Sequence, residues 1–282
     1  MSSRIFIFSN GDLKRKQNTL YFENEAGEKK YIPVEGTQEL MVFGEVNLNK
    51  KFLDFASQNQ MILHFFNYYG YYSGSYYPRE HLNSGHMILK QAEVYLDPER
   101  RLEIAKKFVD GAVKNILKVV DYYARRKDNE KIKDISSHIN ELHLKIAGQD
   151  STESLMAIEG NIRDKYYSAF DEIVEDDNFK FESRSRRPPK NRINALISFG
   201  NSLLYTTALS EIYKTHLDPR IGFLHTTNFR RFSLNLDIAE VFKPVFVDRM
   251  LFSLINKGEL KSSHFEKRMG GVVMNEGGMK IF

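Results

Sequence analysis

The sequence predicts an α+β protein, with an N-terminal, mostly-β domain followed by a larger all-α domain. Two observations lead to this prediction. Up to about residue 77, apolar residues stand in short runs of strand length, and after residue 85 they recur at the 3.6-residue spacing of helices. The 282 residues are also enough for two domains with apolar cores. We therefore expect domains at 1–77 and 86–282, joined by a linker at 78–85.

The N-terminal segment contains several short apolar or alternating runs that predict β-strands. They are 5–8, 19–23, 30–34, 40–43 and 61–66. Residues 24–28, which include Gly27, predict a hairpin-like loop between the second and third runs. From Leu48 to Ala56, apolar residues recur at helical spacing. This domain is therefore expected to be mostly strands, with one inserted helix.

A tyrosine- and glycine-rich turn region at 68–77 ends the first domain. Tyrosines can stack on nucleic-acid bases. Aromatic residues are also common on sheets and at interfaces, and a sheet face or subunit interface is the favoured interpretation. The linker follows, because 75–85 contains Pro78, Asn83 and Gly85.

The remainder of the chain predicts long helices, because apolar residues recur with helical periodicity in six segments. They are 89–96, 98–123, 131–146, 151–174, 191–216 and 233–256. The tail from Met269 has no clear period, and we expect it to be irregular.

Composition limits the chemistry and the location. The sequence has no cysteine, which excludes disulfides and thiolate metal sites. Any metal would need carboxylate, imidazole, carbonyl or water ligands, which favours Mg²⁺ or Mn²⁺. No apolar run approaches the roughly 20 residues that a membrane-spanning helix needs. The first ten residues also lack the pattern of a secretory signal, so we expect a cytoplasmic location.

Positive charge is concentrated in one segment, 180–192. It holds six basic residues and one acidic residue, so its net charge of +5 exceeds the +4 of the whole chain. The basic residues are Lys180, Arg184, Arg186, Arg187, Lys190 and Arg192. A solvated basic loop and an element that binds phosphates both fit this composition.

Glu159 interrupts the apolar stripe of the helix predicted over 151–174. It stands four residues after Leu155 and three before Ile162, on the inward face. A buried carboxylate is costly unless a partner compensates it. A salt bridge to an arginine is one explanation, and a metal ligand or general acid/base is the other.

A histidine and two further carboxylates stand in similar surroundings. His225 follows an apolar triplet, where it is either a core histidine or a functional one. Asp237 and Glu240 are three residues apart, which places both on one face of a helix. Such a pair either lies in solvent at a helix start or shares a cation. Carboxylates and an imidazole near basic segments suit a divalent ion that acts on a phosphodiester.

The surrounding residues resemble the three signature blocks of the CRISPR-associated adaptation integrase/endonuclease family, in the order of that family. The blocks are 156–163, 186–189 continuing into 191–200, and 222–225 continuing through 233–244. Residues 32–35, 42–44 and 97–101 add to the resemblance, which spans nearly the whole chain.

The resemblance implies a set of site residues and partners. Glu159, His225 and Glu240 would bind one divalent metal, Mg²⁺ or Mn²⁺, and Asp237 would be a further catalytic acidic residue. Supporting residues would be Asn161, Tyr166 and Ser233. Nucleic-acid-binding residues would be Arg184, Arg186, Arg187, Lys190, Arg230, Arg231 and Lys243. The family also implies a homodimer built through the β domain, double-stranded and branched DNA, and a small CRISPR-associated adaptation partner protein.

The implied function is a metal-dependent DNA endonuclease/integrase. It would insert DNA fragments as spacers into a CRISPR array, through attack of a 3′-hydroxyl on a phosphodiester. Two alternatives stay open from the residues. One is a non-catalytic nucleic-acid-binding scaffold, whose DNA affinity would need no divalent ion. The other is an unrelated metal-dependent phosphodiesterase that acts on small nucleotides or RNA.

Overall fold

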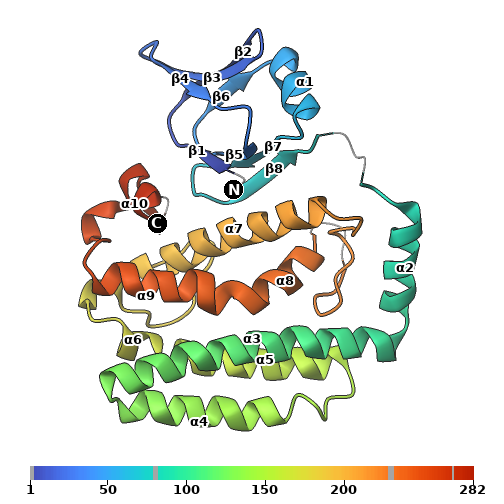
Figure 1. Ribbon diagram of the computed structural model, residues 1–282. Coiled ribbons are helices and arrows are strands. Elements are labelled where there is room, and N and C mark those ends of the chain that lie inside the picture. Colours follow the sequence, from blue (N-terminus) through green and yellow to red (C-terminus); the bar gives the residue numbers. More distant parts are fainter. Residues whose placement is uncertain (1–2, 79–81, 228–231, 269) are drawn as a thin grey trace. The chain divides into compact units, whose positions relative to one another are not determined.

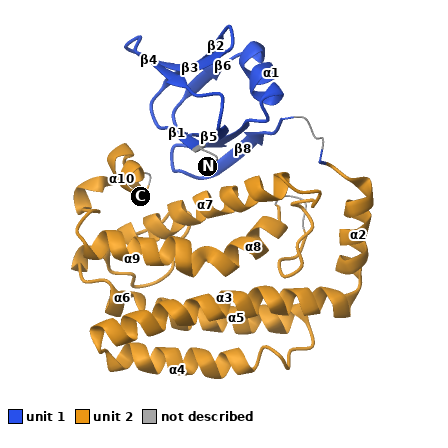
Figure 2. Ribbon diagram, in the orientation of Figure 1, with its two compact units in different colours: residues 1–82 blue, residues 83–282 orange. Residues whose placement is uncertain are grey.

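The computed structural model describes residues 3–78, 82–227, 232–268 and 270–282 (Figure 1). The chain divides into two compact units, 1–82 and 83–282 (Figure 2). The division falls inside the segment expected to be the linker. The first unit is rich in strands and the second is mostly helical, which confirms the predicted fold class.

Within its described residues, the first unit contains two four-stranded sheets. One has the order β1-β5-β7-β8, in which β8 alone is antiparallel to its neighbour. The other has the order β4-β3-β2-β6. The elements are β1 (Ser3–Ile7), β2 (Gly11–Lys16), β3 (Thr19–Asn24), β4 (Lys29–Ile32), β5 (Thr37–Val42), β6 (Val46–Leu48), α1 (Lys50–Gln58), β7 (Ile62–Phe66) and β8 (Tyr72–Tyr76).

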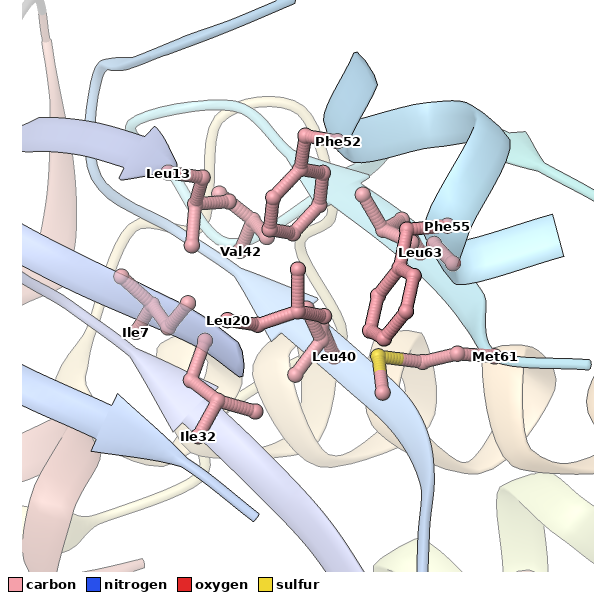
Figure 3. Packing of buried hydrophobic residues seen from close by; sticks show 11 residues of the cluster. Ile7, Leu13, Leu20, Ile32, Leu40, Val42, Phe52, Phe55, Met61 and Leu63 are labelled. Atoms are coloured by element: carbon pink, nitrogen blue, oxygen red, sulfur yellow. The ribbon is translucent and has the colours of Figure 1, made fainter. Parts of the chain in front are cut away.

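Both sheets and α1 contribute to one apolar core, shown in Figure 3. Leu20 and Leu40 lie on strands of different sheets, and Phe52 and Phe55 reach them from α1. The predicted hairpin joins β3 to β4, and the left-handed backbone at Gly27 allows its turn. The tyrosine-rich region is partly the strand β8, so its members Tyr72 and Tyr76 lie on a sheet.

The second unit is built mainly from helices (Figure 1). Its helices are α2 (Gly85–Leu96), α3 (Pro98–Lys127), α4 (Glu130–Leu144), α5 (Thr152–Tyr167), α6 (Phe170–Ile173), α7 (Arg192–Tyr213), α8 (Leu234–Lys243), α9 (Arg249–Asn256) and α10 (Glu276–Ile281). Its shorter elements are the 3₁₀ turns η1 (Asp177–Phe179) and η3 (Ser262–His264), the π-helical η2 (Pro244–Asp248), and the strands β9 (Phe265–Arg268) and β10 (Gly271–Met274).

The long helix α3 organises the second unit, because it packs against α4, α5 and α8. Its Gly111 gives room to Val241 of α8, and Asn115 donates a hydrogen bond to the Val241 carbonyl at 2.7 Å. Helix α7 is buried over most of its N-terminal half, from Ile193 to Ser202. Helices α5 and α8, which carry the candidate acidic residues, are therefore held by packing on α3. No helix among the described residues has the length and apolarity to cross a bilayer.

The prediction of an irregular tail was wrong. Strands β9 and β10 form an antiparallel hairpin, and α10 follows it. The Val272 N–H donates to the Pro189 carbonyl at 2.8 Å, and Asn275 caps α10. These elements are short and depend on contacts with distant residues, so helical periodicity could not reveal them.

Candidate active site

One arginine links the two helices that carry the candidate acidic residues. Glu159 and Arg163 stand one turn apart on α5, and Arg163 Nε donates a hydrogen bond to Glu159 Oε1 at 2.8 Å. The same guanidinium donates through Nη2 to Glu240 Oε2 on α8. The exposed fractions are 11% for Arg163, 20% for Glu159 and 10% for Glu240. Glu159 therefore has an arginine partner, and that arginine joins it to Glu240.

Glu240 lies between two cations. Its Oε2 accepts from Arg163, and its Oε1 accepts from Lys243, whose Nζ lies 4.7 Å from the centre of the Tyr205 ring. Burial alone would raise the pKa of Glu240, but the charges of Arg163, Lys243 and His225 lower it to about 2. Glu240 is therefore an anion at neutral pH.

Asp237 holds His225 in place. The Asp237 carboxylate is fully buried and accepts the backbone N–H groups of Phe223, Leu224 and His225 at 2.5, 3.0 and 3.0 Å. It also bonds His225 Nδ1 at 2.8 Å. A carboxylate beside Nδ1 favours the tautomer with the proton there, which leaves Nε2 as the basic nitrogen. Asp237 thus acts on the site by positioning His225.

The loop that carries His225 lies directly against the start of α8. A Cβ at Gly222 would stand 2.7 Å from the Ser233 carbonyl carbon and 2.8 Å from Asp237 Oδ2, so only glycine fits. Ser233 Oγ accepts the Gly222 N–H at 2.8 Å and donates to the Arg220 carbonyl at 2.6 Å. Ser233 therefore supports the loop from a buried position.

Comparison with known proteins agrees with the resemblance seen in the sequence. Residues 5–282 match the family model described as CRISPR associated protein Cas1. The chain belongs to the Cas1 family. A relative from Thermodesulfovibrio yellowstonii, named CRISPR-associated endonuclease Cas1 2, is 59% identical over 281 residues, which are 100% of this chain and 84% of the relative.

Solved structures show the same fold. A Cas1 protein from Thermotoga maritima superposes with a TM-score of 0.89 at 50% identity, over 99% of this chain and 86% of the other. A casposase bound to its integration product superposes with a TM-score of 0.84 at 23% identity, over 99% of this chain and 80% of the other. At that identity the casposase supports the fold alone.

The proposed metal ligands of this Cas1 chain have suitable chemistry. Glu159, His225 and Glu240 offer two carboxylates and one imidazole, which suit Mg²⁺ or Mn²⁺. Both carboxylates contact Arg163. Within the described residues, however, no three His, Asp or Glu side chains converge closely enough to hold a metal. These ligand types suit a divalent cation, but the Arg163 guanidinium lies between Glu159 and Glu240.

Two other expected residues have different surroundings. Asn161 is exposed on α5 and lines a surface cavity of about 410 Å³ with His138, Lys165 and neighbouring side chains. The structure does not bring it to Glu159 and Glu240.

Tyr166 is fully buried, and its hydroxyl faces the Asp248 carboxyl without forming a hydrogen bond of good geometry. Tyr166 is therefore a core residue beside the site.

The side chains of the basic segment differ in their exposure to solvent. Arg184 donates to Asn194 Oδ1 at 2.8 Å, to Ser198 Oγ at 3.2 Å and to the Ser185 carbonyl. These contacts fix Arg184, and with it this segment, to α7, and its binding of nucleic acid stays a prediction. Arg186, Arg187 and Lys190 are exposed. Arg230 and Arg231 lie outside the described residues.

The sequence interpretation missed two residues of the site, Arg163 and Asp248. Arg163 stands four residues after Glu159, and that i, i+4 spacing was the available signal. Asp248 lies in the π-helical turn after α8, where the helical pattern gives no guide to burial. Burial raises the pKa of Asp248 to about 6, and the nearby charge of Arg163 opposes this rise.

Proposed function

We propose that this chain is a metal-dependent DNA endonuclease and integrase that inserts DNA fragments as spacers into a CRISPR array. The observation that supports it is the meeting of Glu159 and Glu240 at one guanidinium, with His225 held by Asp237 of the same helix as Glu240. These three residues are far apart in the sequence and come from α5, α8 and the loop before α8. Carboxylate and imidazole ligands of this kind suit a divalent ion that promotes phosphoryl transfer.

Each residue of the site has a distinct task in this proposal. Glu159, Glu240 and His225, through Nε2, would hold Mg²⁺ or Mn²⁺. Asp237 keeps the His225 ring in the orientation that presents Nε2. Lys243 stays beside Glu240 and adds positive charge where an anionic phosphodiester would approach.

The reaction is a displacement at phosphorus. A bound divalent metal would polarise a phosphoryl oxygen and favour deprotonation of the attacking hydroxyl. The 3′-oxygen of the incoming fragment bonds to phosphorus, the bond to the leaving 3′-oxygen breaks, and that oxygen takes up a proton. With water as the attacking group, the same displacement cleaves DNA.

Exposed cations of the basic segment would hold the DNA backbone for this displacement. Arg186, Arg187 and Lys190 are exposed next to Arg184, which is anchored on α7. Contacts of Arg and Lys with phosphates fix the position of DNA without reading its sequence. This division of tasks predicts that the segment sets affinity, while α5 and α8 set catalysis.

The decisive experiment measures Mn²⁺-dependent strand joining and cleavage of branched DNA by Glu159→Gln and His225→Ala. We expect each variant to lose at least about a hundredfold in rate, because each loses one metal ligand. Glu153→Gln is a matched control, since Glu153 is an exposed carboxylate on the same helix. Full activity of Glu159→Gln or His225→Ala, with the control also active, would overturn the catalytic assignment.

A non-catalytic scaffold is the second candidate. It is favoured by the ion pairs of Glu159 and Glu240 with Arg163, because these carboxylates have partners without a metal. A scaffold would bind DNA with an affinity that falls as salt rises. It would show the same affinity with EDTA as with Mn²⁺, and it would neither cut nor join strands.

The family resemblance also supports a homodimer formed through the first unit and a small adaptation partner protein. Light scattering of the full chain should give twice its mass of 32.9 kDa. A mass of 32.9 kDa at micromolar concentration would contradict the dimer.

A further inference from the structure

Arg163 stands in the position that a shared cation would take. It donates to Glu159 Oε1 and to Glu240 Oε2, so it bridges two carboxylates from different helices. Lys243 differs, because it contacts Glu240 only, through the other oxygen, and lies over the Tyr205 ring. With two carboxylates and two cations, this cluster is neutral before any metal binds.

A divalent cation and the guanidinium cannot both occupy this position. Carboxylate oxygens bind Mn²⁺ or Mg²⁺ at about 2 Å, whereas they contact a guanidinium nitrogen at almost 3 Å. A metal bound by Glu159 and Glu240 would therefore be only a few ångströms from Arg163. Repulsion between a double and a single positive charge is strong in a mostly buried site, because little water screens it.

We propose that Arg163 is a built-in counter-cation that holds Glu159 and Glu240 until a metal binds, and that metal binding requires its guanidinium to leave at least one of them. This inference rests on the proposed metal site. Before loading, Arg163 keeps the half-buried Glu159 and the buried Glu240 compensated and close together. The same contacts lower the apparent metal affinity, because they must be given up on binding.

A second buried carboxyl is available to receive the displaced guanidinium. Asp248 is buried in η2 and forms no ion pair with any described residue. The charge of Arg163 already reaches it, as does that of Lys243. A rotation of Arg163 from Glu240 toward Asp248 would keep its charge compensated without exposing it to solvent.

The test is a calorimetric titration of the full chain with Mn²⁺ alone, without DNA. We expect Arg163→Met to bind Mn²⁺ at least about tenfold more tightly than the unmodified chain, because the competing charge is gone. Arg163→Lys covers the case in which Arg163→Met fails to fold. One ammonium group cannot bridge both carboxylates in the same way, so it should also bind more tightly.

Two controls separate this effect from a general loss of ion pairs. Arg4→Met removes the partner of the buried Glu39 in the first unit, and it should leave Mn²⁺ affinity unchanged. Lys243→Met removes a cation that does not bridge, and its gain in affinity should be smaller. An equal gain for Lys243→Met would overturn the proposed role of the bridge.

Failure of this inference differs from failure of the metal site. Equal Mn²⁺ affinity of the unmodified chain, Arg163→Met and Arg163→Lys would overturn the counter-cation and leave the site standing. If Glu159→Gln combined with Arg163→Met binds Mn²⁺ as tightly as Arg163→Met, the metal lies elsewhere, and both proposals fall. Loss of binding in that double variant supports the metal site, and tighter binding by Arg163→Met than by the unmodified chain supports the counter-cation.

Discussion

Two buried carboxylates near α8 have opposite pKa shifts. Burial opposes the charged form of both Glu240 and Asp248. Glu240 contacts Arg163 and Lys243, and its pKa falls to about 2, whereas Asp248 contacts neither cation and its pKa rises to about 6. Contact with a cation, more than depth of burial, therefore decides whether the pKa of each acid falls or rises.

Asp248 should make the stability of the fold depend on pH. Its pKa is about 6 when folded and 3.8 as the ordinary value, so the folded state binds the proton more strongly. Ionisation therefore destabilises the fold as pH rises from about 4 to about 6, and the penalty is constant above that. Asp248→Asn should remove the penalty and stabilise the chain by roughly 1–3 kcal/mol at pH 7.5.

Urea unfolding at pH 4 and pH 7.5 measures this effect. The difference in unfolding free energy between Asp248→Asn and the unmodified chain should be near zero at pH 4 and largest at pH 7.5. The opposite trend, with the variant losing stability as pH rises, would mean that the ionised carboxylate stabilises the fold.

At the scale of elements, the site depends on how closely a loop approaches a helix. Gly222 lies against Ser233 and Asp237 at the start of α8, so that Asp237 reaches three N–H groups and His225. Gly222→Ala should push this loop away, lower stability by roughly 1–3 kcal/mol and reduce strand joining. Thermal unfolding and the Mn²⁺-dependent joining assay measure the two effects.

Gly160→Ala is the matched control for that substitution. Gly160 neighbours Glu159 on α5, and a Cβ there would meet nothing within 4 Å. Alanine in a helix is favoured over glycine by roughly 0.5–1 kcal/mol, so this variant should gain stability. If Gly222→Ala behaves like Gly160→Ala, the close approach of the loop does not matter to the site.

The elements also show what the sequence could and could not predict. Leu155 and Ile162 of the apolar stripe are buried as predicted, since helical spacing reports one buried face. The same pattern placed Glu159 inward, but it could not reveal that α8 would bring Glu240 to Arg163. That meeting depends on tertiary packing between segments 77 residues apart.

The strand β2, which carries four charged residues among six, was missed because pairing with β3 and β6 stabilises it.

At the scale of the whole molecule, the excess positive charge of one segment should dominate DNA affinity. The net charge of 180–192 exceeds that of the entire chain, and Arg186, Arg187 and Lys190 are exposed within it. If each contacts a phosphate of duplex DNA, the slope of log affinity against log salt changes by about 0.9 for each lost contact. Replacing all three with Gln should therefore weaken binding and reduce the slope by roughly 2–3.

A matched control separates local from overall charge. Lys107, Lys114 and Lys133 are other cationic residues of the second unit, and their replacement by Gln removes the same three charges. Fluorescence anisotropy with one labelled duplex at several salt concentrations compares the two triple variants. A general attraction would lower the slope equally in both, whereas a DNA-binding segment at 180–192 changes it mainly in the first.

Because Arg184 is held by Asn194 and Ser198, its replacement should lower thermal stability as well as affinity.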